Sequence, residues 1–279
     1  MIDAHQHLWR IGRNDCVWPP PELAAIHRDF EPADLKAVAE PLGVKGSILV
    51  QSQPSDRDTD YLLGLAAADP FILGVVGWAE LKAPGAPARI AALAARPKLK
   101  GLRPMLQALE DDAWIADVAL DPAIDAMVTA GLGLDALVFT RHLPHLEAMA
   151  RRRPDLTVII DHAAKPPIAA GDLDPWREQM RRLADLPQVW CKLSGLLTEA
   201  APGAGAEALS PYVEHLLQVF GPDRLIWGSD WPVMLLAGDY AGWLDMARQL
   251  TVRLGEAARR GIFETNARRA YRLDERLFR

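Results

Sequence analysis

Eight short, almost continuously apolar runs recur along the chain of 279 residues, and they constrain its fold more than any other feature. Stretches such as "LTVIID" and "RLIWGSD" are apolar at consecutive positions rather than at alternate ones. Strands that are covered on both faces show this pattern, which is typical of a parallel sheet. The predicted strands lie at Ile2–His7, Gly46–Gln51, Ile72–Trp78, Leu99–Met105, Leu132–Phe139, Leu156–His162, Val189–Leu193 and Leu225–Ser229.

The segments between these runs have helical periodicity. Val213, Leu216, Leu217 and Phe220 follow the i, i+3, i+4, i+7 spacing of one apolar helix face, and a Gly-Pro pair then ends the helix. Similar periodicity predicts helices at Asp56–Ala68, Ala86–Ala95, Asp117–Ala130 and Pro175–Leu186. Strands and helices therefore alternate along most of the chain.

Eight strand–helix units in a chain of this length predict an α/β fold of the (β/α)8 TIM-barrel type, with one domain over residues 1–279. An open doubly wound sheet is the competing architecture, but no GxGxxG turn follows the first strand. The flexible stretch "APGAGA" at Ala201–Ala206 fits a loop after the seventh strand better than a linker between domains. The long first loop, Trp9–Pro32, is expected at the C-terminal face of the barrel, where active sites form.

Composition excludes several classes of function. A formal net charge of −6 and an isoelectric point near 5.7 argue against nucleic-acid and anionic-membrane partners. Cys16 and Cys191 are too few and too far apart for a disulfide framework or a zinc knuckle. No signal peptide fits the first residues, and no apolar run reaches the ~18 residues of a membrane span. A cytoplasmic protein is expected.

Polar side chains end several of the apolar strands. His5 and His7, two residues apart on the first strand, are predicted to project together. His162 follows Asp161 at the end of the sixth strand, and Asp230 follows the eighth. Arg103 lies toward the end of the fourth strand in "KGLRPMLQ". A barrel brings strand ends together around one rim, so these residues are candidates for a catalytic site.

A set of motifs in fixed order resembles the amidohydrolase superfamily, in its amidohydrolase-2 branch of lactonases. The motifs are "IDAHQHLW", "DHAAKP", "CKLSGL", "GSDWPV" and "TNARRAY", and the resemblance runs from Met1 to about Leu273. Within that branch, "VVGWAEL", "KLKGLRPMLQ" and "DALVF" look most like the sugar-lactone hydrolases, typified by L-fuconolactonase and L-rhamnonolactonase. The 2-pyrone-4,6-dicarboxylate lactonases and 4-sulfomuconolactonases are more distant relatives.

The chain departs from the wider superfamily at the metal-bridging position. Many amidohydrolases bridge two metals with a carboxylated lysine that ends strand four, whereas this chain has Arg103 and Pro104 there. His142 lies just beyond the fifth strand. A binuclear centre is therefore not expected. His5, His7, His162 and Asp230 could hold one Zn²⁺, but the resemblance to metal-free lactonases implies that no cofactor is required.

The resemblance implies that a small-molecule lactone is the substrate and that water opens its ring. Asp230 is the predicted general base, and His5, His7 and His162 are predicted to polarise the carbonyl oxygen. Residues near the strand ends and in the first loop are predicted to contact the substrate. They are Arg103, Trp9, Gln51, Lys165, His27, Arg28 and Trp231.

Three other functions stay open at this point. A metal-dependent decarboxylase of the same superfamily branch would use a related His-x-His, His and Asp set. A pyrone- or muconolactone-type lactonase would need cations for its carboxylates, whereas Arg103 is the one arginine expected at the rim. A non-catalytic barrel that serves as a binding scaffold conflicts with so many polar residues at strand ends.

Overall fold

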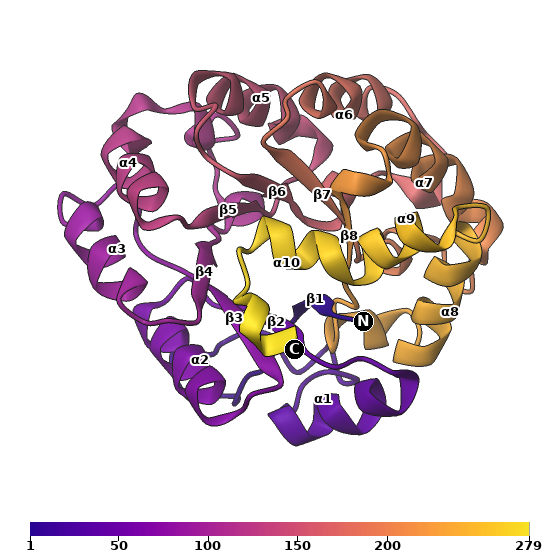
Figure 1. Ribbon diagram of the computed structural model, residues 1–279, viewed down its shortest axis with the longest axis horizontal. Helices are drawn as coiled ribbons and strands as arrows, with labels where there is room; N and C mark the ends of the chain where they lie inside the picture. Colours follow the sequence, from indigo (N-terminus) through magenta and orange to yellow (C-terminus); the bar gives the residue numbers. More distant parts are fainter. Residues whose placement is uncertain (279) are drawn as a thin grey trace.

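The computed structural model describes residues 1–278, without the side chains of Glu275 and Leu277, and it forms a parallel eight-stranded barrel (Figure 1). Each strand pairs with the next one in the chain, so the strand order is β1 to β8. The predicted (β/α)8 barrel is confirmed. The strands are β1 Asp3–Gln6, β2 Ser47–Val50, β3 Ile72–Gly77, β4 Leu99–Leu102, β5 Gly133–Ala136, β6 Val158–Ile160, β7 Val189–Leu193 and β8 Leu225–Trp227.

Hydrogen bonds just beyond β8 close the barrel against β1. The amide of Asp230 donates to the carbonyl of His5 at 2.8 Å, and the amide of His7 donates to the carbonyl of Trp231 at 2.7 Å. These bonds alternate between the two segments as in a parallel ladder. The closure therefore runs through the same residues that sequence analysis selected for chemistry.

Asp3 stabilises this closure through hydrogen bonds with Ser229 and Tyr240. Its carboxylate accepts hydrogen bonds from the amide and the hydroxyl of Ser229 at 2.8 and 2.6 Å, and from the hydroxyl of Tyr240 at 2.9 Å. The register between β1 and β2 shifts between Asp3 and Gln6. Strict alternation of side chains is thus broken within β1.

Within residues 1–278, ten α-helices follow the strands, and α1 to α8 form a ring around the barrel (Figure 1). They are α1 Pro32–Ala39, α2 Asp56–Ala68, α3 Ala86–Ala94, α4 Asp121–Ala130, α5 Leu143–Arg152, α6 Trp176–Ala184, α7 Ala206–Phe220, α8 Tyr240–Leu250, α9 Glu256–Arg260 and α10 Asn266–Ala270. The predicted helices are all present. The helix predicted at Asp117–Ala130 begins later, at Asp121, because Asp117 caps a separate 3₁₀ turn, Val118–Leu120, before α4.

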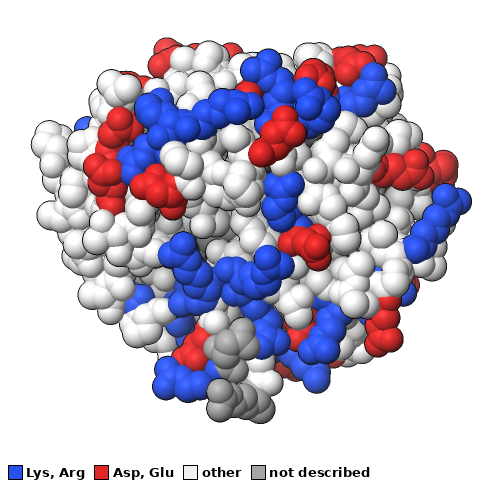
Figure 2. Space-filling model, turned by 45° about the horizontal axis from the view of Figure 1, so that its top comes forward, with Lys and Arg blue, Asp and Glu red and all other residues white. Residues whose placement is uncertain are grey.

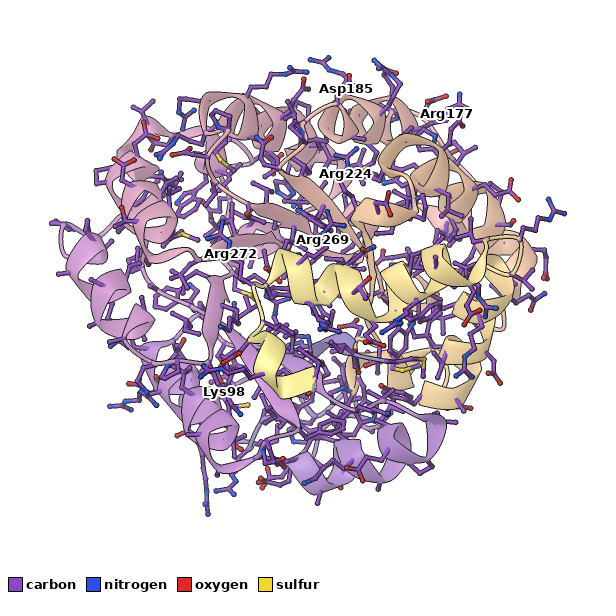
Figure 3. The ribbon with its side chains drawn as sticks, viewed as in Figure 1. Lys98, Arg177, Asp185, Arg224, Arg269 and Arg272 are labelled. Carbon is purple, nitrogen blue, oxygen red and sulfur yellow. The ribbon has the colours of Figure 1, made fainter. Side chains whose placement is uncertain are left out.

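Two basic side chains, labelled in Figure 3, bind backbone carbonyl groups where a helix leads into the next strand. The last carbonyls of a helix have no partner within the helix, so a nearby cation stabilises them. Lys98 donates to the carbonyls of Ala66, Asp69 and Ile72 at 2.6, 3.0 and 2.6 Å, and Arg224 donates to those of Ala184, Leu186 and Val189 at 2.8, 2.9 and 3.2 Å.

The last helices cross one end of the barrel (Figure 1). Residues of α10 and the turn after it, including Ala267, Tyr271 and Leu273, pack against the apolar starts of the strands, such as Ile2 and Trp190. This end is filled, so a site can form only at the opposite end, where the strands finish.

Charge is mixed over the surface. Lysine and arginine side chains lie among aspartate and glutamate side chains on the face drawn in Figure 2. Within the described residues 1–278, no helix is long and apolar enough to cross a membrane.

Candidate active site

The two histidines of the first strand meet at the end of the barrel where the strands finish. His5 and His7 are almost fully buried, and their Nε2 atoms lie 3.2 Å apart. His7 Nδ1 lies 2.8 Å from the carbonyl oxygen of Val50, which can only accept a hydrogen bond. His7 therefore has a proton on Nδ1, and its Nε2 faces the site. The structure thus brings the two imidazoles together.

An unusual backbone turn brings the third histidine to the same point. His162, Ala163, Ala164 and Lys165 follow β6 with φ angles of 52°, 50°, 60° and 50°. Four consecutive L-residues in the left-handed region cost roughly 1–2 kcal/mol each. Such strain persists where surrounding contacts stabilise it, and it concentrates at functional sites. Trp176 supplies one such contact, because its Nε1 donates to the carbonyl of Ala163 at 2.7 Å.

A glycine after β7 makes room for the His162 ring. A Cβ atom on Gly195 would lie 2.5 Å from His162 Nδ1 and 2.6 Å from its Cγ. The hydroxyl of Ser194 lies 2.9 Å from the same Nδ1. His162 is thus held between a hydrogen bond and a close backbone approach, with its Nε2 directed at the site.

Asp230 faces all three imidazoles. Its Oδ1 lies 3.3 Å from His7 Nε2 and 3.7 Å from both His5 Nε2 and His162 Nε2. Burial alone would raise the pKa of Asp230, but His162 and then the two other histidines lower the pKa below its ordinary value. Burial lowers the pKa of His162 to about 4. At neutral pH the site therefore pairs an ionised carboxylate with a neutral imidazole.

A buried charge network lies beneath these four residues. Lys192 of β7 is fully buried, and its Nζ lies 2.6 Å from Asp135 Oδ2 of β5 and 2.9 Å from Asp161 Oδ1. Arg103 Nη1 lies 3.2 Å from Asp161 Oδ2, and the hydroxyl of Tyr271 donates to Asp135 at 2.7 Å. Two cations and two carboxylates neutralise one another inside the barrel.

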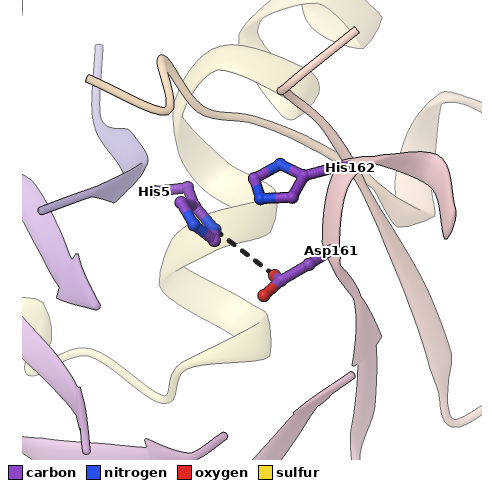
Figure 4. A group of neighbouring side chains, drawn as sticks. All are labelled: His5, Asp161 and His162. Atoms are coloured by element: carbon purple, nitrogen blue, oxygen red, sulfur yellow. Dashed lines mark ion pairs between the residues drawn. The ribbon is translucent and has the colours of Figure 1, made fainter. Parts of the chain in front are cut away.

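The network reaches the site through His5 and Asp161. Figure 4 shows His5 and His162 beside the Asp161 carboxylate, and His5 Nδ1 lies 3.3 Å from Asp161 Oδ1. Burial alone would raise the pKa of Asp161, but Lys192 and then His5 hold the pKa well below its usual range. Sequence reasoning missed Lys192 and Asp135. The available signal was a charged residue inside each of the apolar motifs "CKLSGL" and "DALVF".

A cavity of about 310 Å³ opens above the four central residues. It is the size of a pocket for one small ring. Five predicted site residues line it: His7, Arg103, His162, Lys165 and Asp230. The wall also contains Val17, Trp18, Ser52, Gln53, Pro54, Met105, Gln107, Ala108, Leu137 and Val233, none of which the sequence analysis selected.

The other predicted substrate contacts do not line this cavity. Trp9 is fully buried and donates to the carbonyl of Arg28 at 2.8 Å, and Trp231 packs edge-on against Phe30. Gln51 donates to the carbonyl of Arg103 at 2.8 Å. His27 Nδ1 donates to the carbonyl of Pro19 at 2.8 Å, and the guanidinium of Arg28 lies over the Phe30 ring. Direct contact of these five side chains with substrate stays a prediction.

Gln53 connects the first loop to the pocket. Its amide nitrogen donates to the carbonyl of Trp18 at 2.9 Å, and its oxygen accepts from the amides of Val17 and Trp18 at 3.3 and 3.4 Å. The indole of Trp18 is thereby held at the edge of the cavity. No local pattern in the sequence predicts this contact, which spans 35 residues.

The donor set has the chemistry for one metal ion. Ligand atoms of His5, His7 and Asp230 all lie within 4.8 Å of one another, and imidazole nitrogen with carboxylate oxygen suits Zn²⁺. The His7 Nε2 lone pair, left free by the Nδ1 hydrogen bond, points into this group. Lys192 of β7 is buried and paired with Asp135 and Asp161, so it does not bridge two ions. A single-ion site fits these residues.

The parallel barrel, a histidine on β1 and another directly after it, a histidine after β6 and an aspartate after β8 are together typical of a barrel hydrolase. Comparison with known proteins agrees. The model of the amidohydrolase family matches residues 2–273, and the chain belongs to this family. The resemblance that the motifs indicated is confirmed.

Relatives of known name and structure cover nearly the whole chain. It is 52% identical over 277 residues to L-fucono-1,5-lactonase of Burkholderia ambifaria, covering 98% of this chain and 96% of that protein. Two crystal structures of an amidohydrolase from Burkholderia multivorans superpose with TM-scores of 0.91 and 0.90, at 35% and 34% identity, over 98% of this chain and 99% of theirs. The first contains HEPES and the second contains zinc.

Proposed function

We propose that this protein is a lactonase that hydrolyses a neutral sugar lactone, with L-fucono-1,5-lactone as the leading substrate. The identity of 52% with a lactonase of that name supports the reaction class. Eight strands and an intact set of polar residues at their ends support catalysis rather than a binding scaffold.

The basic side chains of the pocket already have partners within the protein, and this observation supports a neutral substrate. Arg103 and Lys165 are the lysine and arginine residues of the described chain that line the cavity. Arg103 is bound to Asp161 and to the carbonyl of Gln51, and Lys165 Nζ lies 3.6 Å from Glu199. Both charges are therefore already neutralised. A substrate with two carboxylates would have to displace these partners, whereas a polyhydroxylated ring can accept or donate hydrogen bonds without doing so.

Asp230 is the general base in this proposal. Ionised at neutral pH, its carboxylate takes a proton from water, and the water oxygen bonds to the lactone carbonyl carbon. The carbonyl π electrons move to the oxygen, which the imidazoles stabilise by hydrogen bonding. The carbonyl then re-forms, the bond between that carbon and the ring oxygen breaks, and Asp230 returns its proton to the leaving alkoxide. The product is the open aldonic acid.

His162 acts by hydrogen bonding rather than by charge. Because burial lowers its pKa to about 4, the imidazole is neutral where the enzyme works. Ser194 and the space at Gly195 hold its ring in place. A bound metal ion would supply Lewis-acid polarisation of the carbonyl, held by His5, His7, His162 and Asp230. A lactone is an activated ester, so hydrogen bonds suffice and we propose that the ion is dispensable.

A substrate screen with two variants tests the proposal. Neutral five- and six-membered aldonolactones should be opened faster than 2-pyrone-4,6-dicarboxylate or 4-sulfomuconolactone, measured by acid release with a pH indicator. Asp230→Asn should lower kcat by ~10²-fold or more with an unchanged circular dichroism spectrum. The exposed Asp172→Asn serves as the matched control and should keep full activity.

The other outcomes would contradict either the proposed substrate or the proposed role of Asp230. Preference for a dicarboxylate would favour the pyrone-type lactonase. Decarboxylation of an aromatic acid, with no lactone opened, would favour the decarboxylase. Near-normal turnover of Asp230→Asn would remove Asp230 from the mechanism.

A further inference from the structure

A lysine and a glutamate from neighbouring loops form an ion pair at the wall of the cavity. Lys165 belongs to the left-handed turn after β6, and Glu199 ends the 3₁₀ turn Leu197–Glu199 after β7. Lys165 Nζ lies 3.6 Å from Glu199 Oε1, and the two side chains are 20% and 22% exposed. Burial raises the pKa of Glu199 above its ordinary value, and Lys165 is the main group that opposes this rise. Lys165 lines the cavity and Glu199 does not, so the cation of the pair faces the pocket.

Two contacts that do not involve Glu199 keep the Lys165 ammonium group at this wall. The backbone amide of Lys165 donates to the carbonyl of His162 at 2.8 Å, which fixes the start of the side chain. Lys165 Nζ lies 5.3 Å from the centre of the Phe139 ring, within the range of a cation–π interaction. Removing the charge of Glu199 should therefore leave the ammonium group beside the cavity, without its counter-ion.

The other basic side chain of the wall cannot be made available in this way. Arg103 is 3% exposed, and its guanidinium is bound to the fully buried Asp161 and to the carbonyl of Gln51. Removing the charge of Asp161 would leave a buried cation unpaired, which is strongly destabilising. Lys165 is partly exposed, so water can solvate its ammonium group when Glu199 loses its charge. Glu199 is therefore the position where one substitution can provide the pocket with an available cation.

We propose that Glu199 is a positioning residue that sets substrate specificity: it keeps Lys165 paired and so excludes lactones that carry a carboxylate. The proposal rests on the proposed lactonase function and names the substrates that this pocket rejects. An acidic lactone would bring its carboxylate close to two others, Asp230 and Glu199, and would find the ammonium group already bound. An unpaired carboxylate that loses its water costs free energy, and this cost discriminates against the acidic ligand. A neutral polyhydroxylated ring carries no such charge.

A pair of lactones that differ in one group tests the proposal. The 1,4-lactones of L-galactonic and galactaric acid have the same ring, and their side chains end in a hydroxymethyl group and in a carboxylate. Glu199→Gln removes the charge and keeps the size of the side chain. It should raise the ratio of kcat/KM for the acidic lactone to kcat/KM for the neutral one by about 10-fold or more, mainly through a lower KM for the acidic lactone. A ratio within about threefold of the wild-type ratio refutes the role of Glu199.

This ratio does not depend on the fraction of folded enzyme, and three variants isolate its cause. Glu199→Asp keeps the charge and should keep the wild-type ratio. Glu207→Gln removes an exposed charge from α7 and should also keep it. Adding Lys165→Met to Glu199→Gln should abolish the gain, because no ammonium group is left to bind the carboxylate. A gain in either single control as large as that in Glu199→Gln, or a gain that persists without Lys165, overturns the proposal.

Binding of galactarate, the open dicarboxylate, tests the same pair without turnover. In calorimetric titration, Glu199→Gln should bind galactarate about 10-fold or more tightly than the wild type. If this affinity rises but no lactone is hydrolysed, the assignment of the reaction fails and the role of Glu199 stands. If lactones are hydrolysed but neither the galactarate affinity nor the ratio changes, the role of Glu199 is refuted and the reaction stands.

Discussion

Replacing Gly195 by alanine should lower activity because the new methyl group displaces the His162 ring. The new Cβ would lie 2.5 Å from His162 Nδ1, whereas an ordinary van der Waals contact begins at 3.4 Å. The ring must therefore move by about 0.9 Å, the difference between these two distances. A displacement of ~1 Å in a catalytic group can cost about 10²-fold in rate. We expect kcat/KM of Gly195→Ala to fall by at least that factor.

The same change also costs stability, for two separate reasons. Gly195 has a φ of 62°, where an L-residue costs roughly 1–2 kcal/mol. Crowding within a packed interior costs roughly 1–3 kcal/mol more. The sum, about 2–5 kcal/mol, should appear as a lower Tm, at about 2–4 °C per kcal/mol for a protein near this size.

Gly203→Ala separates these two effects. Gly203 has a φ of 75°, but a Cβ there would have no atom within 4 Å. This variant should lose roughly 1–2 kcal/mol of stability and keep its activity. Acid release from the lactone gives kcat/KM for both variants, and thermal melts give Tm. If the activity of Gly195→Ala lies within about threefold of that of Gly203→Ala, the space at Gly195 does not hold His162 and this reasoning is wrong.

Three further predictions concern the metal, the pocket and pH. Removing metal with a strong chelator, verified by elemental analysis, should leave most lactonase activity while His5→Asn and His7→Asn impair it; recovery only on adding Zn²⁺ or Mn²⁺ would show that the ion is required. Trp18→Ala should raise KM by about 10-fold with a smaller change in kcat, measured by steady-state kinetics, because Trp18 lines the cavity and has no group that could transfer a proton. Burial raises the pKa of Asp58 to about 7 from an ordinary value of 3.8, so its folded form holds a proton that the unfolded chain has lost. The wild type should therefore gain roughly 2 kcal/mol of stability relative to Asp58→Asn as pH falls from 7 to 5. Urea unfolding at the two pH values measures this gain, and the same difference in free energy of unfolding between wild type and variant at both would contradict it.

The barrel could be predicted from the sequence because its strands are apolar on both faces. Burial inside the barrel and beneath the helices leaves a continuous run, and each of the eight predicted runs contains one observed strand. The candidate catalytic residues could be found in the sequence for a related reason. His5, His7, His162 and Asp230 interrupt or end apolar runs, and the topology then brings those positions together.

The same apolar context hides the charge network. When both faces of a strand are buried, alternation no longer shows which residues point into the barrel. Lys192 and Asp135 therefore look like isolated exceptions, and only their approach to 2.6 Å reveals a pair. The left-handed turn after β6 was equally hidden, since "HAAK" contains no glycine or asparagine to indicate positive φ. The hydrogen bonds of Gln53 to the first loop depend on tertiary structure alone.

The hydrogen bonds between β1 and the segment after β8 determine when the end of the barrel can close during synthesis. Asp3 hydrogen-bonds to Ser229, a residue 226 positions later in the chain. At about 5–20 residues per second, the ribosome finishes this partner roughly 10–45 s after Asp3. During that interval His5 has neither the carboxylate nor the amide of Asp230 beside it. The candidate site can therefore form only late in translation, and a nascent chain that stalls before Asp230 should contain most of the barrel strands but not this group of four residues.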